Sequence, residues 1–149
     1  MAKTTELREV ELFVREQLGK DYPNHTFTEK PLRLRKKKDG SYAFHKFDAV
    51  SEDNAIVASI KSHSWLTSGG NLPSGKIGQI YQSLYLLSLV DAKTKLLILT
   101  DREAYEGFLE VSDGKVADDI EIKFCPLPPE LQARVKKVQQ KASQEMSRE

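Results

Sequence analysis

The chain has a single cysteine, Cys125, and no long apolar run. One cysteine excludes an internal disulfide and is typical of a reducing compartment. No apolar stretch approaches the roughly 18 residues of a membrane span, and the first residues lack the apolar segment of a signal peptide. We therefore expect a cytoplasmic protein that does not associate with a membrane.

Several functional signatures are also missing. The sequence contains no G-x-G-x-x-G motif, no P-loop, no metal-binding Cys/His cluster and no internal repeat, which argues against a phosphate cradle of the nucleotide-binding kind. The formal net charge is only +1, so overall charge does not indicate a partner. The 149 residues, 39% hydrophobic and 30% charged, suit one globular domain with its own core. We expect that domain to span residues 1–128, followed by a polar helix or tail over residues 129–149.

Apolar periodicity and turn residues predict the order of elements. The order is α-β-β-β-α-β followed by further elements, which indicates an α/β or α+β sandwich with an additional C-terminal strand and helix. The expected core elements are a helix over residues 5–18 ended by Gly19, strands over 26–36, 42–50 and 55–62, a helix over 76–90 and a strand over 95–99. The later elements are a short helix from a capping box at Thr100 to Gly107, an edge strand over 120–124, and a helix from about residue 130.

Two other segments bear on function. The second half of the helix over 76–90 is apolar on nearly every side, so it is either central or the interface of a homodimer. The segment from residue 63 to residue 75 is rich in Ser, Gly, Asn and Pro, which indicates a loop. Within it, Thr67 to Gly75 is either a flap that contacts substrate or a tolerated surface insertion.

Asp48 and Lys61 form the most informative pairing in the sequence. If the turn is Ser51 to Asn54, Val50 lies opposite Ala55, and Asp48 lies on the face that Ser59 and Lys61 share. A one-residue change of register would undo this arrangement. A carboxylate beside a lysine suits metal-dependent phosphodiester hydrolysis, in which Mg²⁺ takes hard oxygen ligands. A solvated surface ion pair has the same ingredients, so both interpretations stay open.

The spacing of Asp48, Ser59 and Lys61, taken with the order of elements, resembles the PD-(D/E)xK nuclease superfamily and its restriction-endonuclease-like fold. The resemblance covers residues from about Glu6 to Asp101. It implies a DNA endonuclease that uses Mg²⁺ or Mn²⁺, with Asp48 as a metal ligand and Lys61 as the catalytic lysine. It also implies a glutamate of the first helix beside the metal, for which Glu6, Glu9 and Glu11 are candidates, Glu9 and Glu6 being preferred. Acids in the first turns of a helix also complement the helix dipole, which is the simpler explanation.

Ser59 departs from the family pattern, because the triplet Ser59-Ile60-Lys61 has a serine where the family has Asp or Glu. A serine hydroxyl is neutral and a poor Mg²⁺ ligand, so three outcomes follow. Glu52 or a glutamate of the first helix supplies the missing charge and the protein cleaves DNA. Alternatively, the domain is catalytically inactive and binds nucleic acid, or it binds a protein partner.

The one basic cluster lies between Lys30 and Lys38, where six Lys or Arg residues occur without an acid. We expect its later members to contact nucleic acid: Arg33, Arg35, Lys36, Lys37 and Lys38. A solvated hairpin tip that deters edge aggregation is the alternative. We expect His63 to share the face of Lys61, where it contacts phosphate, assists proton transfer or is a structural residue. For Tyr42, Phe44 and Phe47, we expect core packing rather than stacking on bases.

Overall fold

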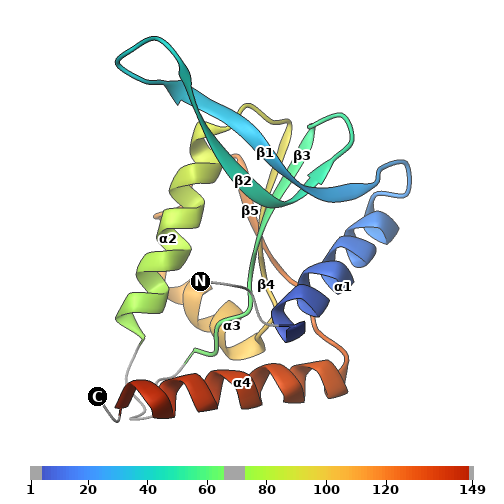
Figure 1. Ribbon diagram of the computed structural model, residues 1–149, viewed down its shortest axis with the longest axis vertical. Coiled ribbons are helices and arrows are strands. Elements are labelled where there is room, and N and C mark those ends of the chain that lie inside the picture. The colour runs from blue at the N-terminus through green and yellow to red at the C-terminus, as the bar shows by residue number, and fades with distance from the viewer. Residues whose placement is uncertain (1–4, 66–72, 148–149) are drawn as a thin grey trace.

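Five strands form one mixed sheet at the centre of the molecule, and two helices cover each of its faces (Figure 1). The computed structural model describes residues 5–65 and 73–147. The elements are α1 (Thr5–Asp21), β1 (Phe27–Lys36), β2 (Tyr42–Ser51), β3 (Ile56–Lys61), α2 (Ser74–Leu89), β4 (Thr94–Leu99), α3 (Arg102–Val111), β5 (Ile120–Phe124) and α4 (Pro129–Ser147). The predicted mixed α/β architecture and order of elements are therefore confirmed.

The strands lie in the sheet in the same order as in the sequence, β1-β2-β3-β4-β5. β1, β2 and β3 form an antiparallel meander, and β3, β4 and β5 run parallel to one another. Every residue of β3 before Lys61 is buried, because helices cover both faces of this central strand. β5 lies at the edge of the sheet, as predicted from its alternating sequence.

Each face of the sheet has its own hydrophobic core, and alternation along the strands assigns residues to one core or the other. On β3, Val57 packs in the core beneath α2 and α3, whereas Ile56, Ala58 and Ile60 pack in the core beneath α1 and α4. Ser59 and Lys61 share the face of Val57 by the same alternation. They therefore lie on the α2 side of β3.

The turn between β2 and β3 gives a different register from the predicted one. Val50 pairs with Val57 rather than Ala55, which is a shift of two residues. The turn is longer than predicted, and a side chain helps to hold it: the Ser51 hydroxyl accepts a hydrogen bond from the backbone N–H of Ile56 at 2.9 Å. Asn54 has a φ of 63°, a left-handed conformation that asparagine adopts more readily than most residues.

The ends of α1 and α3 differ from the prediction, and one of the differences has a clear packing reason. α3 continues through Gly107 to Val111, since Gly107 provides room for the buried ring of Trp65. A Cβ at this glycine would lie 2.3 Å from the Trp65 ring. α3 is also capped by Asp101 rather than Thr100, because the Asp101 carboxylate accepts from the backbone N–H of Ala104. α1 continues two residues past Gly19 to Asp21.

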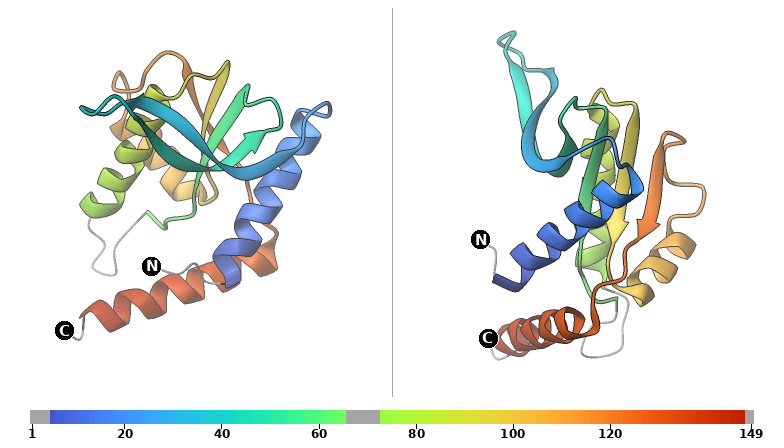
Figure 2. Two further views of the ribbon diagram at one scale, coloured as in Figure 1. Left: turned by 45° about the horizontal axis from the view of Figure 1, so that its top comes forward. Right: turned by 90° about the vertical axis from the view of Figure 1, so that its right-hand side faces the viewer.

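The C-terminal segment is a helix, and it packs on the body of the protein (Figure 2). α4 lies against α1, and its Leu131 and Val135 are buried in the core on that side of the sheet. Among the described residues, none of the helices combines the length and the apolar character that a bilayer crossing requires. Most of the segment predicted to be a flap lies outside the described residues.

Candidate metal centre

A β-bulge in β2 sets the position of Asp48. Between the pairs Thr28–Val50 and Lys30–Phe47, β1 advances two residues and β2 advances three, so Asp48 and Ala49 together oppose Glu29. A bulge of this kind interrupts alternation and redirects a side chain. Asp48 accordingly lines a cleft with residues of α1. The prediction that Asp48 shares a face with Lys61 is therefore wrong. It assumed strict alternation along β2, and the bulge interrupts that alternation.

The Asp48 carboxylate is held by the backbone of the neighbouring strand. Its Oδ2 accepts a hydrogen bond from the Ile60 N–H at 2.8 Å, next to the pair Ala49–Ala58 of the β2–β3 ladder. The backbone carbonyl of Asp48 also accepts from Arg15 Nε at 2.8 Å. β3 therefore orients the carboxylate of Asp48, and α1 holds its backbone.

Three carboxylates from three different elements meet at this place. Glu11 of α1, Glu29 of β1 and Asp48 of β2 each offer an oxygen, and these oxygens lie within 4.8 Å of one another. Two oxygens bound to one Mg²⁺ lie at most about 4.2 Å apart, because each metal–oxygen distance is near 2.1 Å. Shifts of roughly half an ångström would bring the three side chains to a single ion. All three side chains are half-buried, and the set fits a hard divalent cation.

Cations balance the acids of the cleft, whose volume is about 660 Å³. Arg15 Nη2 lies 3.3 Å from Glu11 Oε1, and Lys46 Nζ lies 3.4 Å from Glu29 Oε1. Three acids and three cations line the cleft together with Leu12: Glu11, Glu29, Asp48, Arg8, Arg15 and Lys46. A divalent cation on the acids would leave the basic side chains to face a phosphodiester.

The glutamates preferred from the sequence lie elsewhere. Glu9 points to α4, where Arg134 donates to both of its oxygens at 3.2 and 2.7 Å. These hydrogen bonds lower the pKa of Glu9. Glu6 lies one turn before Glu9 on the same side of α1, where its charge acts on Arg134. Glu11 is rotated by about 200° from Glu9, which turns it toward β1 and β2.

Sequence reasoning named Glu11 but preferred its neighbours, and it missed Glu29. The buried stripe of α1 consists of Val10, Val14 and Leu18. Acids flank this stripe on both sides, and helical periodicity does not show which flank meets the sheet edge. Glu29 could have been found only from the pairing of β1 with β2, which depends on the bulge.

Ser59 and Lys61 lie on β3 at the α2 side of the sheet. Ser59 is 5% exposed, so its hydroxyl is buried. Lys61 is half-buried. Burial lowers the pKa of the nearby His45, the charge of Asp48 raises it, and the charge of Lys61 lowers it. The net effect on His45 is a lowered pKa, and burial is the main cause. His45 thus lies in the electrostatic field of both residues that the sequence singled out.

His63 is neutral at physiological pH. Burial lowers its pKa to about 4, and the charges of Lys61 and Lys76 act in the same direction. A neutral imidazole adds no positive charge to a phosphate site. Any contact of His63 with nucleic acid would therefore be a hydrogen bond rather than an ion pair.

The basic cluster lies on the hairpin that β1 and β2 form. Its later members are exposed on the hairpin: Arg33, Arg35, Lys36, Lys37 and Lys38. The guanidinium of Arg33 lies 4.3 Å from the centre of the Tyr42 ring, and Lys36 lies 5.8 Å from it. Lys30 differs from the rest, because its ammonium donates to Asn54 at 2.7 Å.

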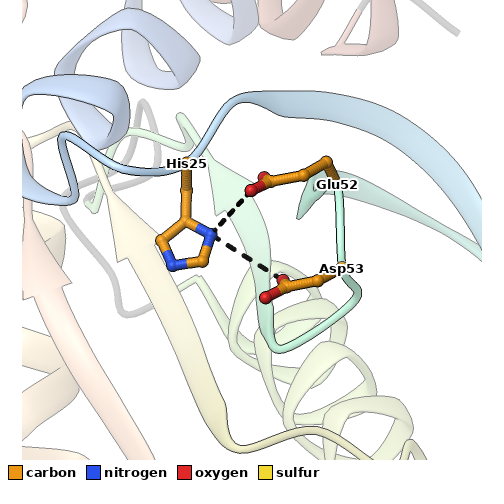
Figure 3. A group of neighbouring side chains, drawn as sticks. All are labelled: His25, Glu52 and Asp53. Atoms are coloured by element: carbon orange, nitrogen blue, oxygen red, sulfur yellow. Dashed lines mark hydrogen bonds and ion pairs between the residues drawn. The ribbon is translucent and has the colours of Figure 1, made fainter.

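A second group of metal-ligand side chains lies at the turn between β2 and β3 (Figure 3). His25 Nδ1 is 3.1 Å from Glu52 Oε1 and 3.7 Å from Asp53 Oδ1. Glu52 also accepts from the Thr26 N–H, and Asp53 accepts from the Ser51 hydroxyl and the Ala55 N–H. Glu52 therefore serves the turn and is not placed to replace the carboxylate missing at Ser59.

No protein-family model, curated protein or solved structure matches this chain.

Proposed function

We propose that the protein is a metal-dependent DNA endonuclease of the PD-(D/E)xK type, with its metal held by Glu11, Glu29 and Asp48. The observation that carries the proposal is the convergence of these carboxylates from α1, β1 and β2. A catalytically inactive domain would not need acidic groups from other elements beside Asp48. Mg²⁺ or Mn²⁺ is the expected ion, because all of the ligands are hard oxygens.

The architecture supports the same proposal. The resemblance implies a helix, a three-stranded meander, a second helix and a further strand. The elements from α1 to β4 have this order. Fold alone does not imply function, so the acid cleft carries the argument and the architecture only supports it.

The acidic and basic residues of the cleft would have different roles in hydrolysis. When bound, the divalent ion would acidify a coordinated water and screen the charge that develops on the phosphate. Glu11, Glu29 and Asp48 would hold that ion, and Arg8 and Arg15 would orient the phosphodiester. Lys46 is 64% exposed, so its ammonium is free to move from Glu29 to the phosphate. Glu11 and Glu29 would thus supply the negative charge that Ser59 lacks.

Ser59 favours a second candidate function. A buried serine at the family's acidic position is what a nuclease-like domain without catalytic activity would have. Such a domain would bind nucleic acid, or a protein partner, through the same surfaces. An inactive domain that binds nucleic acid makes the same prediction for DNA binding as the nuclease and the opposite prediction for cleavage, whereas one that binds a protein partner predicts neither.

The test is cleavage of supercoiled and single-stranded DNA in Mg²⁺ or Mn²⁺ by the parent protein, Glu29→Gln and Glu52→Gln. We expect cleavage by the parent, its loss by more than about 100-fold in Glu29→Gln, and no change in Glu52→Gln. Glu52 is the matched control because it belongs to the other ligand cluster. EDTA should abolish all cleavage.

Other results would change the conclusion. Cleavage by Glu29→Gln at the parent rate would show that the acid cleft is not the metal centre. DNA binding by a parent protein that cleaves with neither metal would favour the inactive domain.

A further inference from the structure

The hairpin of β1 and β2 carries an aromatic side chain that the sequence led us to expect in the core. Phe44 is 65% exposed, whereas Phe47 is buried at 1%. The tip of the hairpin extends beyond the rest of the sheet (Figures 1 and 2). Exposing a large apolar ring on a projecting element is unfavourable in water unless the ring contacts something else.

Strand pairing places Phe44 on one continuous surface. Phe44 lies directly opposite Arg33, and cross-strand partners share a face of the sheet. By alternation along β2, Tyr42, Phe44 and Lys46 point to the same side. Leu32 and Phe47 point to the other side, into the core beneath α2 and α3. We name the exposed surface that includes Arg33, Tyr42, Phe44 and Lys46 the outer face of the hairpin.

The outer face of the hairpin leads directly into the acid cleft. Lys46 belongs to both, since it also lines the cleft and pairs with Glu29. Phe44 is four residues before Asp48, which is about 13 Å along an extended strand. A polymer lying along the outer face would therefore reach the carboxylates.

The charge of the hairpin suits a polyanion. From Lys30 to Phe47 the chain has seven Lys or Arg residues and one acid, Asp39. Hydrogen bonds from the hydroxyl and N–H of Ser41 lower the pKa of Asp39, so this acid is ionised and bound within the turn. Arg33 stacks on Tyr42 and keeps the edge of its guanidinium available to donate to a phosphate.

We propose that the outer face of the hairpin binds an unpaired DNA strand, with one base stacked on Phe44 and phosphates on Arg33 and Lys46. This inference rests on the proposed function, because it names the class of substrate that enters the acid cleft. An exposed ring offers a flat surface to an unstacked base, whereas the bases of a duplex have their faces covered by each other. Single strands, overhangs and unpaired flaps have free base faces, and we expect these to be preferred.

Binding measured in EDTA separates this inference from catalysis. We would follow the fluorescence anisotropy of a labelled 12-nucleotide single strand and of a duplex of the same length, at several salt concentrations. The variants are Phe44→Ala, Phe44→Trp and Arg33→Gln, with Tyr85→Ala as the matched control. Tyr85 is an aromatic residue of α2 with nearly the same exposure, 64%.

We expect Phe44→Ala to weaken single-strand binding by about 10-fold or more, and Phe44→Trp and Tyr85→Ala to bind as the parent does. Arg33→Gln should weaken binding and reduce the slope of the logarithm of the binding constant against the logarithm of salt concentration by about one, because one fewer phosphate is neutralised. Unchanged binding by Phe44→Ala, equal loss in Tyr85→Ala, or a parental preference for the duplex would each overturn the inference. Because these binding measurements are made without metal and the cleavage test requires it, a failure of the metal centre and a failure of the hairpin are distinguishable.

Discussion

The two clusters of metal-ligand side chains look alike in composition and differ in what surrounds them. Glu11, Glu29 and Asp48 line a cleft between α1 and the hairpin. His25, Glu52 and Asp53 lie at a turn, and both of these carboxylates are exposed (Figure 3). Each cluster combines side chains from segments distant in the sequence. Proximity of ligand atoms alone therefore does not distinguish a candidate metal centre from a structural contact.

The hydrogen bonds of the carboxylates make the distinction. At the turn, hydrogen bonds from its own backbone and from the Thr26 N–H lower the pKa of Glu52, and hydrogen bonds from Ser51 and Ala55 lower that of Asp53. These oxygens already satisfy backbone and hydroxyl donors of the turn. In the cleft, Asp48 likewise accepts from a backbone N–H, that of Ile60, but side-chain cations, Arg15 and Lys46, lie beside Glu11 and Glu29. Side-chain cations can move away when a metal binds, whereas backbone donors cannot move without a change of fold.

The largest expected effect is on metal affinity. Asp48→Asn should lower the affinity for Mn²⁺ by more than about 100-fold, because losing even an outer-shell partner costs 10–100-fold. The asparagine oxygen can still accept from Ile60 N, so the strands should remain in place. Isothermal titration calorimetry with Mn²⁺ measures this, and Asp53→Asn is the control. Equal losses in both variants would remove the difference between the two clusters.

The second effect is the stabilisation that the metal provides. A ligand that binds only the folded state at 100 times its Kd raises the free energy of unfolding by about 2.7 kcal/mol. We expect this gain in urea unfolding of the parent and of Glu52→Gln, and its loss in Glu29→Gln. A gain that survives in Glu29→Gln and disappears in Glu52→Gln would assign the metal to the turn.

The third effect concerns acid pH and the turn. A carboxyl whose pKa is lowered by folding stabilises the protein above its ordinary pKa, and this contribution is lost as pH falls through the lowered value. For Asp53, the loss should begin near pH 4 and increase below it. Asp53→Asn should have a thermal midpoint that falls less steeply over this range. Parallel curves for the two proteins would show that the turn does not contribute in this way.

His63 affects stability at higher pH than Asp53 does, and its effect should be the same in the parent protein and in Asp53→Asn. Its pKa is lowered to about 4, so the unfolded chain takes up a proton first as pH falls below the ordinary histidine value. Stability should therefore decrease between about pH 6.5 and 4 in the parent and in Asp53→Asn. His63→Gln should flatten the curve in this window alone, and an unchanged curve would contradict the buried, neutral imidazole.

The smallest effect tests the cation beside Glu29. Lys46→Met makes the cleft more negative and should raise Mn²⁺ affinity by about 1.5- to 5-fold, since exposed ion pairs are worth about 0.2–1 kcal/mol. The gain should shrink in high salt, because screening weakens charge interactions near the surface. A fall in affinity would indicate that Lys46 holds Glu29 in the geometry that the metal needs.

Much of the architecture could be predicted from local patterns. The apolar stripe Val10, Val14 and Leu18 indicates a helix with one buried face, and the Asp39-Gly40 turn indicates the hairpin. The continuation of α3 through Gly107 could not be predicted, because this glycine makes room for the ring of Trp65 from a distant segment. Phe44 was expected in the core but is exposed. Its exposure depends on how far the strand extends past its neighbours, which a local pattern does not show.

Periodicity, turn residues and composition are enough to predict the elements, their order and the residue types available for chemistry. Which of these residues meet depends on how the elements pack. The bulge at Asp48 turns a carboxylate toward α1, and the rotation of α1 brings Glu11 rather than Glu9 to it. Both depend on packing between segments distant in the chain. A one-residue change in register or a half-turn of a helix alters the site without altering any local pattern.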